Sequence, residues 1–349
     1  MTRTTADGRD STRCPGPPLV SVVTPTYNRS DYLAETIDSV LDQDYPAIEL
    51  IVVDDGSTDG TTDILERFGD RIHVIRQSNA GQVRAVNVGF GSTRGDYVTI
   101  VNDDDPLRPT ALSTMIDALE SNLDVLAAYP DWDLIDSDGV TASHITPLDF
   151  SLADMVRFHL CLPGPGAVFR RRILDRLGGW NTRFRWVADF DFWLRVGLLG
   201  PMLRVPHRVA TWRRHPAGAT LATSRLALAL EQLDVIRHFF ESNDLPPSIR
   251  ALESEATASA LMVAASVARE PGTSSLWTRF DIADNVSRLV HTRVVPVGES
   301  RAETPSEIIN WQAQTILRDE SMIGRLRMDL SIADNHIAML QRTLALRDE

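Results

Sequence analysis

Short runs of aliphatic and β-branched residues alternate with amphipathic segments over the first 120 residues. The apolar runs predict strands at residues 19–23, 48–53, 72–75 and 97–101. Between these runs, apolar positions recur at helical spacing and predict helices at residues 33–41, through Ile64 and Leu65, and at 83–90. Runs nearly continuous in Val and Ile are typical of parallel strands covered by helices on both faces. The pattern predicts an α/β domain with a Rossmann-like, mostly parallel sheet flanked by helices.

The pattern continues to about residue 220. It predicts, in order, a helix at 112–119, a strand at 125–129, a turn at 136–139, a strand at 167–169, a helix ending at Leu177, a helix at 189–199, and closing strands at 203–205 and 209–212.

After residue 221 the chain is rich in Ala and Leu, which predicts a helical region over 221–302. From residue 303 a seven-residue repeat runs through Ile316, Ile323, Leu330, Ile337 and Leu344. A sustained heptad favours a terminal coiled-coil helix, which would join two copies or a partner protein, or else pack on its own domain. The expected organisation is therefore a disordered leader at 1–17, the α/β domain at 18–220, the helical region at 221–302 and the long helix at 303–349.

Charge and composition narrow the possible partners. Lys and Arg total 35 against 48 Asp and Glu, a net charge of −13, so nucleic acid is not an expected partner. Cys14 and Cys161 are the two cysteines, and they support neither a disulfide framework nor a zinc site. The longest apolar stretch, around residues 260–268, is shorter than the roughly 18 residues of a membrane span. The leader has no apolar core of a signal peptide. We expect a cytoplasmic protein, with peripheral membrane association as an open alternative.

Two groups of carboxylates follow predicted strands. Asp54 and Asp55 precede Gly56 directly after the second strand, and Asn102-Asp103-Asp104-Asp105 follows the fourth. In open α/β sheets, ligands bind at the carboxyl ends of strands. The first pair is suited to hydrogen bonding with a nucleobase or ribose, and the alternative is a turn or helix cap. The second group suits a magnesium or manganese ion shared with substrate phosphates, and the alternative is a solvated loop.

The same stretches resemble family 2 glycosyltransferases, which have the GT-A fold. The resemblance covers roughly residues 18–216. It is carried by six blocks: residues 20–29, residues 52–60, Asn79-Ala80-Gly81-Gln82 with Asn87 and Gly89, residues 101–109, residues 190–195, and Arg213-Arg214-His215.

The resemblance implies roles for particular residues. The donor nucleotide-sugar would be bound by Pro25, Thr26, Tyr27, Asp54, Asp55, Asn79, Gly81, Arg84 and Asp103. A divalent cation, Mn2+ or Mg2+, would be held by Asp104, Asp105 and His215. Asp189 would be the general base, and Trp180 and Asp191 would lie on the acceptor side.

Two residues depart from the family pattern. Asn102 stands where the family usually has the first Asp of its Asp-x-Asp block, and Ala188 stands where it usually has Glu before the base. An Asn carbonyl is a weaker metal ligand than a carboxylate, so metal affinity would fall unless Asp103 and Asp105 compensate. The missing Glu removes a negative charge beside the base, which would lower the pKa of Asp189 relative to that of relatives.

The favoured function is an inverting, metal-dependent glycosyltransferase. Its donor would be a UDP-sugar or, second, a dTDP-sugar, and its acceptor a hydroxyl of a glycan, lipid-linked sugar, protein or small molecule, as in glycan, cell-surface polysaccharide or glycoconjugate synthesis. The alternative is a catalytically weak or inactive module that acts as a scaffold through its coiled coil. A nucleotidyltransferase is disfavoured because the first loop, residues 24–28, contains no glycine. A dehydrogenase is disfavoured because Gly89-Phe90-Gly91 does not follow the first strand.

Overall fold

The computed structural model describes residues 16–218, 223–269 and 293–296. Within these ranges the strands form one mixed sheet: β1 Val20–Thr26, β2 Ile48–Asp54, β3 His73–Arg76, β4 Tyr97–Ile100, β5 Ala127–Ile135, β6 Thr141–Thr146, β7 Val168–Arg170, β8 Met202–Arg213 and β9 Arg293–Pro296. The spatial order is β3-β2-β1-β4-β7-β5-β6-β9, and β8 pairs with β5. Strands β3, β2, β1 and β4 are parallel neighbours, whereas β7 runs antiparallel to β4 and β5.

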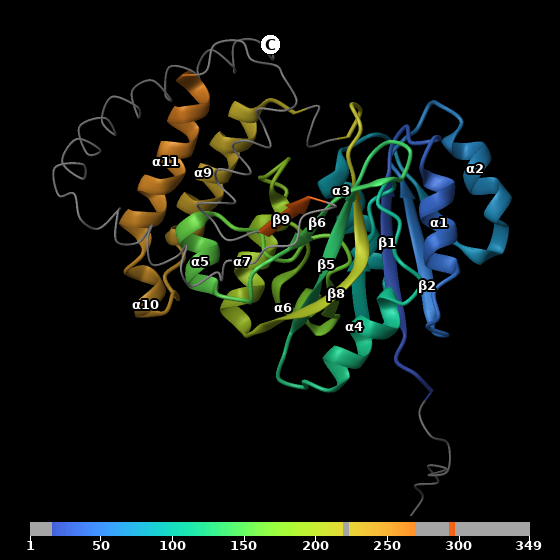
Figure 1. The fold of residues 1–349 in the computed structure, drawn as a ribbon, viewed down its shortest axis with the longest axis horizontal. Helices are drawn as coiled ribbons and strands as arrows, with labels where there is room; N and C mark the ends of the chain where they lie inside the picture. The colour runs from blue at the N-terminus through green and yellow to red at the C-terminus, as the bar shows by residue number, and fades with distance from the viewer. Residues whose placement is uncertain (1–15, 219–222, 270–292, 297–349) are drawn as a thin grey trace, which may run out of the picture.

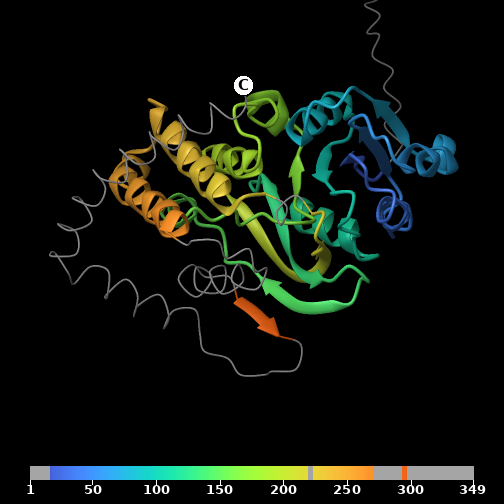
Figure 2. The same cartoon turned by 90° about the horizontal axis from the view of Figure 1, so that it is seen from above.

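Helices cover both faces of this sheet (Figure 1). They are α1 Leu33–Leu41, α2 Thr61–Phe68, α3 Gln82–Ser92, α4 Ala111–Glu120, α5 Leu152–Phe158, α6 Arg172–Leu177, α7 Ala188–Leu199, α9 Arg225–Glu241, α10 Pro247–Arg250 and α11 Glu253–Arg269, with a short 3-10 turn at Gly69–Arg71. Figure 2 shows α9 and α11 packed together at one end of the molecule, and α1 and α2 at the other.

The apolar core is divided by the sheet. Adjacent residues Val22 and Val23 of β1 are both fully buried but belong to different apolar clusters. One cluster contains α1, α2 and α4, and the other contains α3, α7 and α9. Because successive side chains of a strand point to opposite faces, burial on both faces explains the continuous Val and Ile runs.

The carboxyl ends of β1, β2 and β4 meet at one edge of the sheet. Thr26 pairs with Asp54 across β1 and β2, and the Val101 amide donates to the Val23 carbonyl beside the end of β4. Since β7 is antiparallel, its first residue, Val168, lies opposite Thr99 at the same edge. The loops after β1, β2 and β4 and the segment before β7 therefore come together there.

The predicted fold class is confirmed, with local differences. The two expected closing strands are one strand, β8, whose pairing with β5 shifts register around Pro130 and Asp131. Helix α5 and strand β9 were not predicted, and β9 falls in the region expected to be helical. The first 15 residues and the heptad from residue 303 lie outside the described residues. None of the helices in the described part of the chain has the length and apolar character needed to cross a bilayer.

Candidate active site

Asp55 organises the loop that leads into α3. Its carboxylate accepts hydrogen bonds from the backbone amides of Ala80 and Gly81, at 2.8 and 2.7 Å, and from the Gln77 side chain at 2.6 Å. Gly81 has φ +89°, a conformation that favours glycine at the start of this helix. Asp55, which we predicted to bind the donor nucleotide-sugar, thus holds the loop around Gly81 in position through hydrogen bonds to its carboxylate oxygens.

The remaining predicted donor residues surround this loop. Asp54 is buried and accepts a hydrogen bond from the Ser57 amide at 2.9 Å. Tyr27, directly after β1, keeps 44% of its surface exposed, although Pro25 and Thr26 before it are buried. Two further predicted donor residues, Asn79 and Arg84, are exposed. Of these side chains, those of Tyr27, Asn79 and Arg84 are open to a ligand from solvent.

Asp104 and His215 come together although they are far apart in the sequence. His215 Nε2 lies 2.9 Å from Asp104 Oδ2, and the Tyr32 ring packs on the imidazole with centroids 4.6 Å apart. Two neighbouring ligands of an octahedral Mg2+ or Mn2+ ion are about 3 Å apart, so this pair fits such an ion. The described residues contain no group of three or more His, Cys, Asp and Glu side chains suited to a metal, so further ligands would come from substrate phosphates or water.

Asp103 lies beside this pair and faces Arg29. Arg29 Nε is 3.5 Å from Asp103 Oδ1 and 3.8 Å from Asp104 Oδ2. Burial and the neighbouring Asp104 charge raise the pKa of Asp103 to about 7, although Arg29 opposes this shift. Arg29 thus offsets part of the repulsion between the adjacent Asp103 and Asp104 carboxylates.

Asp105 uses both of its carboxylate oxygens inside the protein. Oδ1 accepts from the Arg213 amide at 2.7 Å, and Oδ2 accepts from the Asn102 side-chain amide at 3.0 Å. Asn102 in turn accepts a hydrogen bond from Gln82 on α3. Both carboxylate oxygens of Asp105 and the side-chain amide of Asn102 thus hold the loop, and the metal role expected of Asp105 stays a prediction.

Asp189 lies in the first turn of α7. The amide of Phe190 donates to its carboxylate at 2.8 Å, and the Cys161 thiol lies 3.9 Å from Oδ2. Desolvation raises the pKa of Asp189 above its ordinary value, although these two hydrogen bonds oppose the shift. Cys161 precedes β7 by seven residues, so this contact joins Asp189 to the segment that leads into β7.

Of the two residues expected on the acceptor side, Asp191 is held through its side chain and Trp180 through its backbone. Asp191 is buried and forms an ion pair with Arg195 at 2.8 Å, one helical turn later. Arg195 also donates to the carbonyl of Gly179, which ties the turn before Trp180 to α7. The backbone of Trp180 bonds to Asn87 through both its N–H and its carbonyl. Asp191 is therefore a structural residue in this geometry, because its carboxylate is covered and paired.

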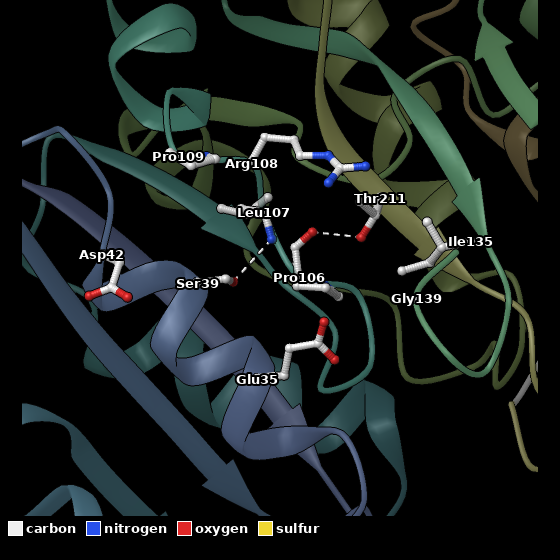
Figure 3. A pocket seen from close by; sticks show the side chains of 10 residues that line it. All are labelled: Glu35, Ser39, Asp42, Pro106, Leu107, Arg108, Pro109, Ile135, Gly139 and Thr211. Atoms are coloured by element: carbon white, nitrogen blue, oxygen red, sulfur yellow. Dashed lines mark hydrogen bonds between the residues drawn. The ribbon is translucent and has the colours of Figure 1, made fainter. Parts of the chain in front are cut away.

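A cavity of about 290 Å³ is lined by residues of α1, of β8 and of the segment 106–109 (Figure 3). Glu35 and Ser39 of α1 line one side, and Pro106 and Thr211 line another. The Thr211 hydroxyl donates to the Pro106 carbonyl at 2.6 Å, and the Leu107 amide donates to Ser39 Oγ at 3.0 Å. None of the predicted site residues lines this cavity, although Pro106 directly follows Asp105.

Three residues were not assigned a role from the sequence: Arg29, Tyr32 and Arg213. Arg213 is nearly fully buried and donates to the Asp104 carbonyl through Nε, and its guanidinium lies over the Tyr32 ring. A signal for Arg29 was available, since three adjacent carboxylates require a nearby cation. The position of Tyr32 had no such signal, because its partners belong to distant segments.

The mostly parallel sheet with carboxylates at its carboxyl edge is an architecture of the GT-A class. Residues 21–178 match the model of the family described as Glycosyl transferase family 2. Glycosyltransferase GlyG of Streptococcus pneumoniae is 36% identical over 143 residues, which cover 39% of this chain and 47% of that protein. The chain is therefore similar to glycosyltransferase family 2 over residues 21–178. It spans about half the length of the curated relatives that it matches.

Solved structures share the fold at lower identity. The structure of Staphylococcus aureus TarS 1–349 in complex with UDP-GlcNAc is 20% identical, with a TM-score of 0.57 over 78% of this chain and 81% of that one. Mannosyltransferase PcManGT from Pyrobaculum calidifontis, in complex with GDP-Man and Mn2+, is 19% identical, with a TM-score of 0.51 over 78% and 82% of the two chains. At this identity the likeness shows the fold alone.

Proposed function

We propose that this protein transfers a sugar from a nucleotide diphosphate sugar to an acceptor hydroxyl with inversion, with a UDP-sugar favoured as donor and a dTDP-sugar second. The observation that carries the proposal is the 2.9 Å approach of His215 to Asp104, at the edge where β1, β2 and β4 end. Two fold neighbours were solved with different nucleotide-sugars, UDP-GlcNAc and GDP-Man, so the fold supports a nucleotide-sugar but does not choose the base.

Asp104 and His215 would hold the divalent cation, and Tyr27 would lie against the nucleoside. When bound, the cation supplies positive charge that stabilises the departing nucleoside diphosphate. Arg29, 3.8 Å from Asp104, adds a fixed positive charge on the protein side of the same region. Asp105 and Asn102 keep the loop in place.

Asp189 is the proposed base. It accepts the proton of the acceptor hydroxyl as the acceptor oxygen bonds to the anomeric carbon and the bond from that carbon to the diphosphate breaks. The departing nucleoside diphosphate carries the electron pair of the broken bond. Because desolvation raises the pKa of Asp189, its carboxylate is a stronger base than an exposed aspartate.

A donor screen followed by a base variant tests this proposal. Thermal shift with manganese should identify the donor, because a bound ligand stabilises the fold according to its occupancy. With that donor, Asp189→Ala should lower turnover by about a hundredfold or more, the usual scale of a lost general base. Asp175→Ala, a change at an exposed carboxylate of α6, is the matched control. Equal turnover of Asp189→Ala and wild type would reject the assigned base.

The alternative function is that of a catalytically weak or inactive scaffold. It would be favoured if no donor stabilised the protein in the screen. We also propose that the protein is cytoplasmic and acts in synthesis of a glycan, cell-surface polysaccharide or glycoconjugate. Residues 303–349 would join two copies of the chain or bind a partner protein.

A further inference from the structure

An exposed tryptophan lies three residues before the proposed base. Trp186 keeps 38% of its surface accessible, and the Arg185 guanidinium lies 4.4 Å from the centre of its ring. Two aromatic residues, Tyr27 and Trp186, belong to the large apolar side chains exposed in the described part of the chain. Tyr27 directly follows β1, and Trp186 lies just before α7. Tyr and Trp side chains are enriched at binding interfaces, because each combines a large apolar ring with a polar group.

The exposure of Trp186 does not come from a loosely held loop. The carboxylate of Glu231 on α9 accepts hydrogen bonds from the backbone amides of both Arg185 and Trp186. Asp234, on the same face of α9, forms two hydrogen bonds with the Arg183 guanidinium, at 3.1 and 2.7 Å. Helix α9 therefore fixes the backbone of residues 183–186 from outside.

The neighbouring residue shows which side of this segment belongs to the core. Phe184 is almost fully buried and packs edge-on against His238 of α9, with ring centroids 5.7 Å apart. The chain thus anchors Phe184 in the interior while Trp186 remains accessible. Phe184 fills the core position of this segment, so the ring of Trp186 is not needed for packing of the interior.

Trp186 is also close enough to Asp189 to contact the same substrate. Three residues of extended chain span at most about 11 Å, which bounds the separation of the two Cα atoms. Within the described residues, the Arg185 side chain makes no hydrogen bond, so its guanidinium donors are available beside the indole. The segment thus combines a fixed aromatic surface and free hydrogen-bond donors beside the base.

We propose that Trp186 and Arg185 form a subsite for the acceptor, and that the acceptor is a saccharide. One face of a pyranose ring carries mainly C–H groups, which pack on an aromatic surface, while its hydroxyls accept hydrogen bonds from a guanidinium. Because α9 already holds the backbone of this segment, binding of the saccharide costs little further conformational entropy. This inference rests on the proposed function for its assignment to the acceptor, and it gives α9 a role in holding the acceptor side.

Binding can be tested without a donor. Saturation-transfer NMR would be recorded with methyl glycosides of glucose, galactose, mannose and N-acetylglucosamine and with their tetrasaccharides. We expect wild type to bind at least one probe, Trp186→Ala to weaken that binding about tenfold, and Trp186→Phe to restore most of it. Leu123→Ala, at an exposed apolar residue before β5 and so at the opposite edge, should bind as wild type does. Absence of binding by wild type, or equal binding by Trp186→Ala, would overturn the proposal.

Transfer kinetics separate this subsite from the function itself. With a bound probe as acceptor, Trp186→Ala should raise the acceptor KM about tenfold and change kcat much less. If wild type turns over no donor, the proposed function fails, and the NMR comparison still decides whether Trp186 binds a saccharide. An unchanged acceptor KM in Trp186→Ala would contradict the subsite while leaving the transferase activity in place.

Discussion

Arg213 links four separate segments around the acidic loop, and replacing it with lysine tests whether that link holds the site together. Its side chain is only 2% exposed. Nε donates to the Asp104 carbonyl at 3.0 Å, and Nη1 donates to the carbonyls of Ser137 and Asp136 at 3.1 and 3.3 Å. Nη2 pairs with Glu35 of α1 at 2.6 Å.

The size of the effect follows from the acceptors that lysine would leave unpaired. A single ammonium at the end of a shorter side chain cannot reach all four partners. Asp136 and Ser137 are exposed and Asp104 is half-buried, so their carbonyls keep some contact with water, and each hydrogen bond lost costs about 1–1.5 kcal/mol; with two lost we expect a loss of about 2–3 kcal/mol. Glu35 is 55% exposed, so its released charge returns to water and adds little.

Urea unfolding followed by circular dichroism measures this loss, with the midpoint and slope fitted together. Glu35→Gln is the control, because it weakens only the partly exposed ion pair and should cost under about 1 kcal/mol. The reasoning would be refuted if Arg213→Lys unfolded within about 1 kcal/mol of wild type, or if Glu35→Gln were destabilised as much as Arg213→Lys.

Further predictions concern the base and the C-terminal segment. Because the pKa of Asp189 is raised and the base must be ionised, activity should be lost as pH falls through that raised pKa, and the acid limb of kcat/KM should lie above the titration range of an ordinary aspartate. An acid limb at or below that range would contradict the burial argument. Cys161→Ala removes a hydrogen bond that lowers this pKa, so the limb should move to still higher pH; an unmoved limb would show that the thiol does not act on Asp189. Deleting residues 303–349 should halve the mass measured by light scattering if the heptad forms a dimer, and an unchanged mass would remove the dimer prediction.

The sheet was predictable where side-chain burial produces a simple pattern. Val22 and Val23 are buried on opposite faces, and the resulting apolar run identifies β1 directly. The prediction was less accurate for β8, where exposed residues 206–208 and a register shift interrupt the apolar pattern without ending the strand. Strand β9 depends on pairing with the distant β6, which no local pattern reports.

Site residues were predictable as far as the family resemblance and strand ends place them. Asp104 follows β4 and His215 follows β8, so the two meet only once the sheet has formed. Their spacing in the sequence therefore cannot indicate the contact. By contrast, the pairing of Asp191 with Arg195 follows from their helical spacing of four, which argues against a role at the acceptor. The structural use of Asp105 could not be foreseen, since a run of aspartates does not show which one accepts backbone hydrogen bonds.

The central claim is that Asp104 and His215 share a divalent cation with the diphosphate of the donor. Calorimetry of UDP with and without manganese tests it directly, comparing wild type, His215→Ala and the control His207→Ala at an exposed position of β8. We predict that manganese tightens UDP binding in wild type and in His207→Ala, and that His215→Ala loses most of this gain. UDP affinity that is the same with and without manganese in wild type, or a gain retained in full by His215→Ala, would contradict the account.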